Sequence, residues 1–150
     1  MRVVIQRVSE AAVAIAGREV GRIDTGLVVL VGIETGDGPA DAAWLAGKIA
    51  ALRIFPDEAG KMNRSVCEIG GGLLVVSQFT LHAATARSNR PGFTRAAKPE
   101  VAIPLYEAFL ADLERETRRR PERGVFGADM QVSLVNDGPV TILIDSRARE

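Results

Sequence analysis

The sequence predicts one α/β domain with a mainly antiparallel, strongly curved sheet and two helices covering one side. Five apolar segments have the length and pattern of strands, whereas only two segments have helical spacing. Two of the strand segments are neighbours joined by turn residues, which favours antiparallel pairing. With 150 residues and 47% hydrophobic content, the chain is expected to form a single domain spanning residues 1–150.

Three of the predicted strands lie in the first half of the chain. Residues 2–8, "RVVIQRV", alternate between apolar and polar side chains, the pattern of a half-buried strand. Residues 26–33, "GLVVLVGI", form a continuous apolar run bounded by glycines, and residues 71–81, "GGLLVVSQFTL", form another.

Two helices are predicted between and after these strands. The first begins near Pro39, which suits a first helical turn, has Asp41 near the positive end of its dipole and ends before Pro56. The second follows Pro99, continues into the basic string "RETRRRPER" and ends at Pro121. The apolar residues with helical spacing are Ala42, Leu45, Ile49, Leu52, Val101, Leu105, Ala108, Phe109 and Leu113.

A hairpin is predicted near the end of the chain. The strands "MQVSLV" and "VTILID" flank Asn136-Asp137-Gly138, residue types that tolerate the positive φ angles of a tight turn. Pro139 then begins the second strand, although it lacks an N–H for the ladder and restricts this position to an edge. Pro139 therefore adds rigidity to a turn that Asn136-Asp137-Gly138 could form without it.

Composition limits the classes of function. The 19 basic residues balance the 19 acidic ones, so no overall field attracts the chain to DNA or to an anionic membrane. Cys67 is the single cysteine and excludes an internal disulfide, and the N-terminal segment alternates rather than forming the apolar stretch of a signal peptide. We therefore expect a cytoplasmic protein. One cysteine and one histidine are too few for a Cys/His zinc site, and we assign no metal.

Two glycine-rich segments resemble nucleotide-binding loops only superficially. "GLVVLVGIETGDGPADAAWL" combines a strand, a glycine loop and a helix, but Pro39, Ala40 and Asp41 follow where a dinucleotide loop needs its third small residue. "EIGGGLL" leads into a strand and lacks the G-K-[ST] ending of a phosphate loop. We interpret both as structural loops.

The strand predicted over residues 71–81 becomes polar towards its end. Strand alternation would place Gln78, Thr80 and His82 on one face, about 7 Å apart in succession, where they could line a substrate cleft. The alternative is an exposed strand end. Thr80 could also act as a nucleophile with His82 as its base, although the sequence places no acid to orient that histidine.

Four motifs resemble those of the D-aminoacyl-tRNA deacylases, also called D-tyrosyl-tRNA deacylases. They are "GKMNRSV", "VSQFTL", "NRPGF" and "VSLVNDGPVT", in the order and spacing of that family, and the opening "MRVVIQRV" is similar too. The resemblance covers the whole chain. It implies a three-layer α/β/β fold, a homodimer with each active site at the interface, and no cofactor. The chain departs from the family pattern at His82, Ala83 and Ala84.

The resemblance implies an activity and assigns site residues. The activity is hydrolysis of the ester between a D-amino acid and the 3′-terminal adenosine of tRNA. If chirality is enforced by exclusion, we expect glycine to be hydrolysed too, because it has no β-carbon to reject. Backbone amides around Ser77, Phe79 and Thr80 would hold the reacting carbonyl, Gln78 would fix the ribose, and the adenosine 2′-hydroxyl would assist attack by water.

The same resemblance gives a role to the stiffened turn. It implies that the Gly138-Pro139 bond is cis and reaches into the partner's pocket, where its backbone faces the α-carbon and excludes L-amino acids. The alternative is a stiff hairpin corner.

Two other functions remain open at this stage. In one, Thr80 is a covalent nucleophile. In the other, the chain is a non-catalytic RNA-binding module that uses a basic string, although such a string is also typical of a solvated helix end. The string consists of Arg118, Arg119, Arg120 and Arg123.

Overall fold

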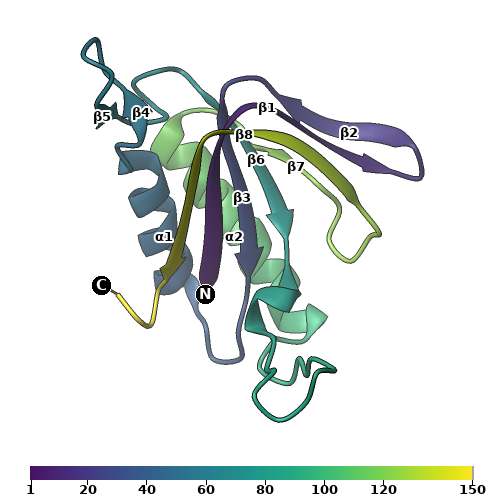
Figure 1. The fold of residues 1–150 in the computed structure, drawn as a ribbon. Coiled ribbons are helices and arrows are strands. Elements are labelled where there is room, and N and C mark those ends of the chain that lie inside the picture. The colour runs from purple at the N-terminus through teal and green to yellow at the C-terminus, as the bar shows by residue number, and fades with distance from the viewer. Residues whose placement is uncertain (150) are drawn as a thin grey trace.

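The chain folds into a six-stranded, strongly curved sheet with two helices against one side (Figure 1). The computed structural model describes residues 1–149. The strand order is β2-β1-β3-β6-β7, and β8 pairs with β1. The strands of this sheet are β1 (Arg2–Ile15), β2 (Arg18–Ile23), β3 (Gly26–Gly32), β6 (Gly72–Ser77), β7 (Glu122–Arg123) and β8 (Gln131–Asp145). The helices are α1 (Pro39–Ala51) and α2 (Pro99–Thr117), with a 3₁₀ turn η1 (Phe79–His82) and a small ribbon of β4 (Phe55–Pro56) and β5 (Met62–Arg64).

The strand directions follow from the connections. β1 is antiparallel to β2, β3 and β8, whereas β3 and β6 are parallel because α1 carries the chain back between them. α1 and α2 contact each other and cover the same side of the sheet (Figure 1). The predicted α/β class with a mainly antiparallel, curved sheet is therefore confirmed.

Two apolar clusters divide the molecule into three layers. The larger cluster lies between the helices and the sheet and includes Ile5, Val29 and Phe109. The smaller one includes Val13, Val28 and Leu74 and fills the space where the curved sheet folds over itself. Because successive residues of β3 face opposite clusters, both of its faces are buried, which explains its continuous apolar run. The α/β/β layering is confirmed.

The helix boundaries agree with the sequence except at one end. α1 begins at Pro39, and the Asp41 carboxylate accepts a hydrogen bond from the Gly38 amide at 2.9 Å. α2 ends at Thr117 rather than at Pro121, because Arg118 adopts a left-handed conformation with φ of 55°. None of the helices among residues 1–149 has the length and apolar character needed to span a membrane.

The predicted C-terminal hairpin is wrong. Both halves of β8 pair with β1, so they form one long strand instead of pairing with each other. Val8 pairs with Asn136 and Gln6 pairs with Thr141, so β8 advances five residues where β1 advances two. The surplus residues form a bulge, residues 137–139, which Asn136 closes by accepting a hydrogen bond from the Val140 amide at 3.0 Å.

The predicted strand over residues 71–81 is too long. β6 ends at Ser77, and the chain then turns into η1 across the end of β3. Gly32 permits this close crossing, because a Cβ there would lie 3.0 Å from the Gln78 carbonyl oxygen, Leu81 Cβ and His82 Cδ2. Gln78, Thr80 and His82 therefore do not share one strand face.

Tyr106, the single tyrosine, offers a test of this packing. Its hydroxyl donates a hydrogen bond to the Val75 carbonyl at 3.2 Å, and burial raises its pKa to about 12. The unfolded chain ionises this phenol near its ordinary pKa of 10, so the stability present below pH 10 is lost as the pH rises towards 12.

We predict that Tyr106→Phe lowers the free energy of unfolding at pH 7 by about 1 kcal/mol, through loss of the hydrogen bond. Above pH 10, the free energy of unfolding of the variant should fall less steeply than that of the wild type. Urea unfolding of both proteins from neutral to alkaline pH measures this. Parallel stability curves would contradict the assignment.

Candidate active site

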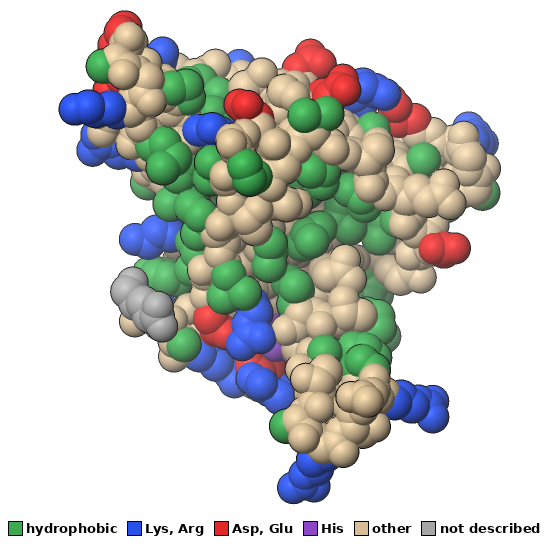
Figure 2. Space-filling model, in the orientation of Figure 1, with side chains coloured by type: hydrophobic (Ala, Val, Ile, Leu, Met, Phe, Trp, Pro, Cys, Tyr) green, Lys and Arg blue, Asp and Glu red, His purple; other side chains and the backbone are tan. Residues whose placement is uncertain are grey.

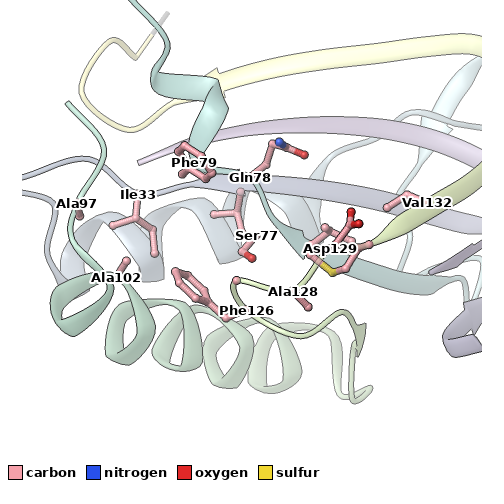
Figure 3. Close-up of a pocket in the computed structure, with 14 residues that line it drawn as sticks. Ile33, Ser77, Gln78, Phe79, Ala97, Ala102, Phe126, Ala128, Asp129 and Val132 are labelled. Atoms are coloured by element: carbon pink, nitrogen blue, oxygen red, sulfur yellow. The ribbon is translucent and has the colours of Figure 1, made fainter. Parts of the chain in front are cut away.

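A cavity of about 300 Å³ opens where β3, β6, the start of α2 and the loop before β8 meet (Figure 3). Ile33, Ala102 and Phe126 form an apolar part of its wall, and Ser77 and Asp129 contribute oxygen atoms. A concave, mostly apolar pocket with a few polar groups is the usual form of a small-molecule site.

The structure brings together the four residues predicted at the end of β6. Ser77, Gln78 and Phe79 line the cavity, and Thr80 follows at the start of η1. The Gln78 amide Nε2 donates a hydrogen bond to the Thr80 hydroxyl at 2.5 Å, so these two side chains are held side by side. These residues are close together because the strand ends and a 3₁₀ turn follows, and not because they share one face of a longer strand.

Two backbone amides at this junction are free to bind a ligand. The Gln78 amide donates to the Val31 carbonyl at 2.7 Å, which continues the sheet for one more bond. Within residues 1–149, the amides of Phe79 and Thr80 have no protein acceptor, as is usual for the first N–H groups of a helical turn. Two adjacent unbonded N–H groups beside a pocket are suited to binding a carbonyl oxygen that gains negative charge.

The alternative of a Thr80 nucleophile with His82 as base is not assembled. His82 is 1% exposed, whereas Thr80 is exposed and bonded to Gln78. Neither ring nitrogen of His82 has a hydrogen-bond partner within residues 1–149, and Nδ1 lies 4.0 Å from a Glu34 carboxylate oxygen. His82, at the end of η1, is thus buried and does not line the cavity.

Arg2, at the start of β1, connects η1 to the sheet. Its Nη1 donates to the Leu81 carbonyl at 2.9 Å, while Nε and Nη2 donate to Asp145 at 3.0 and 2.9 Å. Although burial raises the pKa of Asp145, hydrogen bonds from the Arg147 backbone and from Arg2 bring it below its usual value. Asp145 is therefore a carboxylate that fixes Arg2 beneath the turn. Nothing in the sequence pattern marked Arg2, because a charged residue at a strand end is ordinary.

Gly138 and Pro139 lie outside this cavity. Their peptide bond is cis, and both residues are exposed in the 137–139 bulge. Gly138 has φ of 138°, and an added Cβ would lie 2.8 Å from Val140 Cγ2, so only glycine fits there. Arg7 fixes the bulge: its Nε donates to the Asp137 carbonyl at 2.9 Å and its Nη1 to the Ile54 carbonyl at 2.6 Å.

The sequence contained a signal for Arg7. It continues the buried face of Val3 and Ile5, where an apolar side chain is expected. A charge at such a position usually has fixed partners.

The cavity and the bulge are beside opposite ends of β3 and β6. Val8, beside the bulge, pairs with Gly26, which pairs with Gly72 at the start of β6. Ser77, beside the cavity, is five residues further along, which corresponds to roughly 17 Å. The two groups of predicted site residues therefore do not meet within one chain.

The other sequence candidates are not assembled as sites. The Gly38 amide at the start of α1 already binds Asp41, so the glycine loop offers no free phosphate cradle there. Arg119 and Arg120 lie near Gly72, at the end of β6 away from the cavity. Among residues 1–149, no group of three histidine, cysteine or acidic side chains is arranged to bind a metal.

We predict that Arg2→Met loosens η1. Exchange of the Leu81 and Ala83 amides, which bond within the turn, should accelerate about tenfold or more, because a charged donor to a carbonyl contributes about 1.5–3 kcal/mol. Hydrogen exchange measured by NMR tests this. Arg22→Met is the matched control, since Arg22 makes a similar two-nitrogen contact with Glu19 on β2. Unchanged protection in Arg2→Met would show that the turn holds without this contact.

Comparisons with known protein sequences match this chain, over nearly its whole length, to one family. The family described as D-Tyr-tRNA(Tyr) deacylase matches residues 4–145. The D-aminoacyl-tRNA deacylases of Akkermansia muciniphila and Opitutus terrae are each 61% identical over 150 residues, and the match covers all of this chain and all of each relative.

Solved structures have the same fold. The c-Myc DNA Unwinding Element Binding Protein superposes with a TM-score of 0.92 at 39% identity, covering 99% of this chain and 100% of that one. A probable eukaryotic D-amino acid tRNA deacylase superposes with a TM-score of 0.79 over 95% of this chain and 97% of that one, and its 17% identity supports the fold alone. With matches of this extent, the chain belongs to the D-aminoacyl-tRNA deacylase family, a family of hydrolases.

Proposed function

We propose that this protein hydrolyses the ester between a D-amino acid and the 3′-terminal adenosine of tRNA, and that it rejects L-aminoacyl-tRNA. The observation that carries the proposal is the pair of unbonded amides, Phe79 and Thr80, beside a cavity of about 300 Å³ in a chain of this family. A tRNA substrate and a single free cysteine also favour a cytoplasmic location.

The proposed mechanism needs no cofactor and no strong protein base. An aminoacyl ester is already activated, so the enzyme has to position it and stabilise the developing oxyanion. The Phe79 and Thr80 amides bind the carbonyl oxygen, and Gln78, held against Thr80, binds the terminal ribose. The adenosine 2′-hydroxyl assists the attacking water, and protons move between water and the leaving 3′-oxygen.

The proposed active unit is a homodimer in which the 137–139 bulge of one chain completes the pocket of the other. The bulge is exposed and cannot reach its own cavity, roughly 17 Å away along the sheet. Within residues 1–149, β8 pairs with β1 alone, and its other edge is unpaired. Exposed Val135 and Leu143 lie on this strand, and Figure 2 shows apolar side chains gathered over the face formed by β1 and β8. An unpaired edge with apolar side chains is suited to burial against a second copy.

Discrimination between the two hands is proposed to work by exclusion. The bulge is rigid because Pro139 fixes its own φ, Arg7 holds the Asp137 carbonyl and Asn136 holds the Val140 amide. A rigid backbone packed against the α-carbon leaves no room for the side chain of an L-amino acid. Glycine has no β-carbon to exclude, so glycyl-tRNA is also a substrate in this proposal.

The primary test is deacylation of matched D-tyrosyl-, L-tyrosyl- and glycyl-tRNA by the purified protein. The D and glycyl esters should be hydrolysed, and the L ester should react at least about a hundredfold more slowly, because the wrong hand meets a steric clash. Absence of turnover on all three esters would leave a non-catalytic RNA-binding module as the better description.

Thr80→Val tests the role of the hydroxyl. This change keeps the shape and the backbone amide, so we expect kcat to stay within about tenfold of the wild type. A tRNA ending in 2′-deoxyadenosine should react much more slowly with both proteins. Trapping of an acyl group on Thr80 by rapid quenching and mass spectrometry would instead establish the covalent mechanism.

A heterodimer tests completion of the pocket by the partner. Gly138→Ala displaces the bulge, because its Cβ would lie 3.0 Å from the Val140 amide nitrogen, and Ala128→Trp fills the cavity. Each homodimer should lose most of its activity. A heterodimer of the two variants, isolated with two different tags, should regain about half of the wild-type activity, since one of its two pockets is intact. If bulge and pocket acted within one chain, the heterodimer would stay as weak as either homodimer.

A further inference from the structure

The loop between η1 and α2, residues 83–98, concentrates positive charge. It contains Arg87, Arg90, Arg95 and Lys98, all exposed, and no acidic residue. In Figure 1 it projects as a teal lobe beyond the end of the sheet, and lysine and arginine side chains extend from the same lobe in Figure 2. The net charge of the whole chain is zero, so it does not reveal this local excess of basic residues.

Several contacts fix the 83–98 loop beside the cavity. Ala84 and Gly92 exchange backbone hydrogen bonds of 2.8 and 3.0 Å, which close the outer part of the loop. Phe93 packs edge-on against Phe79 of the cavity wall, with ring centroids 5.0 Å apart. The Ala97 amide donates to the Ile33 carbonyl at 2.9 Å. The base of the loop is therefore fixed against the cavity wall, and its outer part, closed by Ala84 and Gly92 and containing Arg87 and Arg90, projects from the same end of the sheet (Figure 1).

The cations of this loop differ in their partners. Arg95 donates to Glu34 at 2.6 Å, and this hydrogen bond lowers the pKa of Glu34 and ties the loop to the end of β3. Arg87, Arg90 and Lys98 form no ion pair with residues 1–149. Arg95 thus supports the loop, and three cations remain available to an anionic ligand.

We propose that the 83–98 loop binds the phosphates of the single-stranded 3′ end of tRNA and the adjoining acceptor stem, with Arg87, Arg90 and Lys98 as the contacts. The proposal rests on the proposed function, since a terminal adenosine in the cavity places the neighbouring phosphates outside it, at the end of the sheet from which this loop projects (Figure 1). Exposed arginine and lysine side chains on a fixed loop are suited to phosphates, and such contacts set position without reading sequence.

The basic string after α2 is a poorer candidate for this role. Arg119 and Arg120 lie near the start of β6, at the opposite end of that strand from the cavity, and Arg123 is paired with Glu107 at 2.6 Å. These side chains also follow the C-terminus of α2, where positive charge stabilises the helix. They provide a matched control for the loop.

The test compares Arg87→Gln/Arg90→Gln with Arg119→Gln/Arg120→Gln, which lose equal charge. Each protein is assayed on D-tyrosyl-tRNA and on the D-tyrosyl ester of adenosine, which has no phosphate, over about 50 to 200 mM KCl. We expect kcat/KM of the loop variant on tRNA to fall about tenfold at low salt, mainly through KM. The slope of log kcat/KM against log salt should become shallower by about one to two. Its rate on the adenosine ester, and both rates of the control, should match the wild type.

Three outcomes would overturn the proposal. An equal loss on both esters would show that the loop only supports the pocket. A loss in the control as large as that in the loop variant would place the RNA along the α2 end. A wild-type protein that hydrolyses neither ester would refute the proposed function itself, and with it this role of the loop.

Discussion

β1 is the strand on which both parts of the proposed site depend. It is hydrogen-bonded to β3 and β2 along one edge and to β8 along the other, over nearly its whole length. Because both halves of β8 are paired to this one strand, their three surplus residues cannot be absorbed and must protrude as the 137–139 bulge. β1 also carries Arg2 under η1 and Arg7 under the bulge. One strand thus supports the pocket of its own chain and the wall proposed for the partner's pocket.

Charge pairing fixes the ends of this arrangement. The Met1 ammonium group lies 2.6 Å from the buried Asp37 carboxylate, and Arg147 lies 3.1 Å from the same side chain. The adjoining Asp145 binds Arg2. The start of β1, the loop before α1 and the end of β8 are therefore joined at the end of the sheet where η1 crosses. Such linked groups lose little entropy when a substrate binds, since they are already ordered.

The sequence predicted both helices, four of the six strands of the main sheet and the motif residues, because these depend on local periodicity and on family-specific motifs; β2 and β7 were not predicted. It did not predict how the last two apolar runs pair. Asn136-Asp137-Gly138 is compatible with either a hairpin turn or a bulge, and the choice depends on the length of β1, which extends to Ile15 rather than Val8. Alternation likewise continued past Ser77, but the strand ends there because Gly32 lets η1 cross. The role of Arg2 required tertiary contacts that no local pattern contains, whereas Arg7 stood out only as a charge on the apolar face of β1, without its partners.

The separation of pocket and bulge bears on how chirality is read. The cavity offers amides and mainly apolar walls, groups that can hold an ester carbonyl of either hand. A discriminating element has to approach the α-carbon from outside and must not yield, since a few ångströms of movement would admit the wrong hand. A bulge held by Arg7 and Asn136 meets the second requirement within its own chain. In the proposed dimer it meets the first on a second copy, because its own pocket lies beyond the far end of β6. Assembly and stereospecificity are therefore linked in the proposed dimer: one chain would supply the groups for hydrolysis, and its partner would supply the wall that selects the substrate.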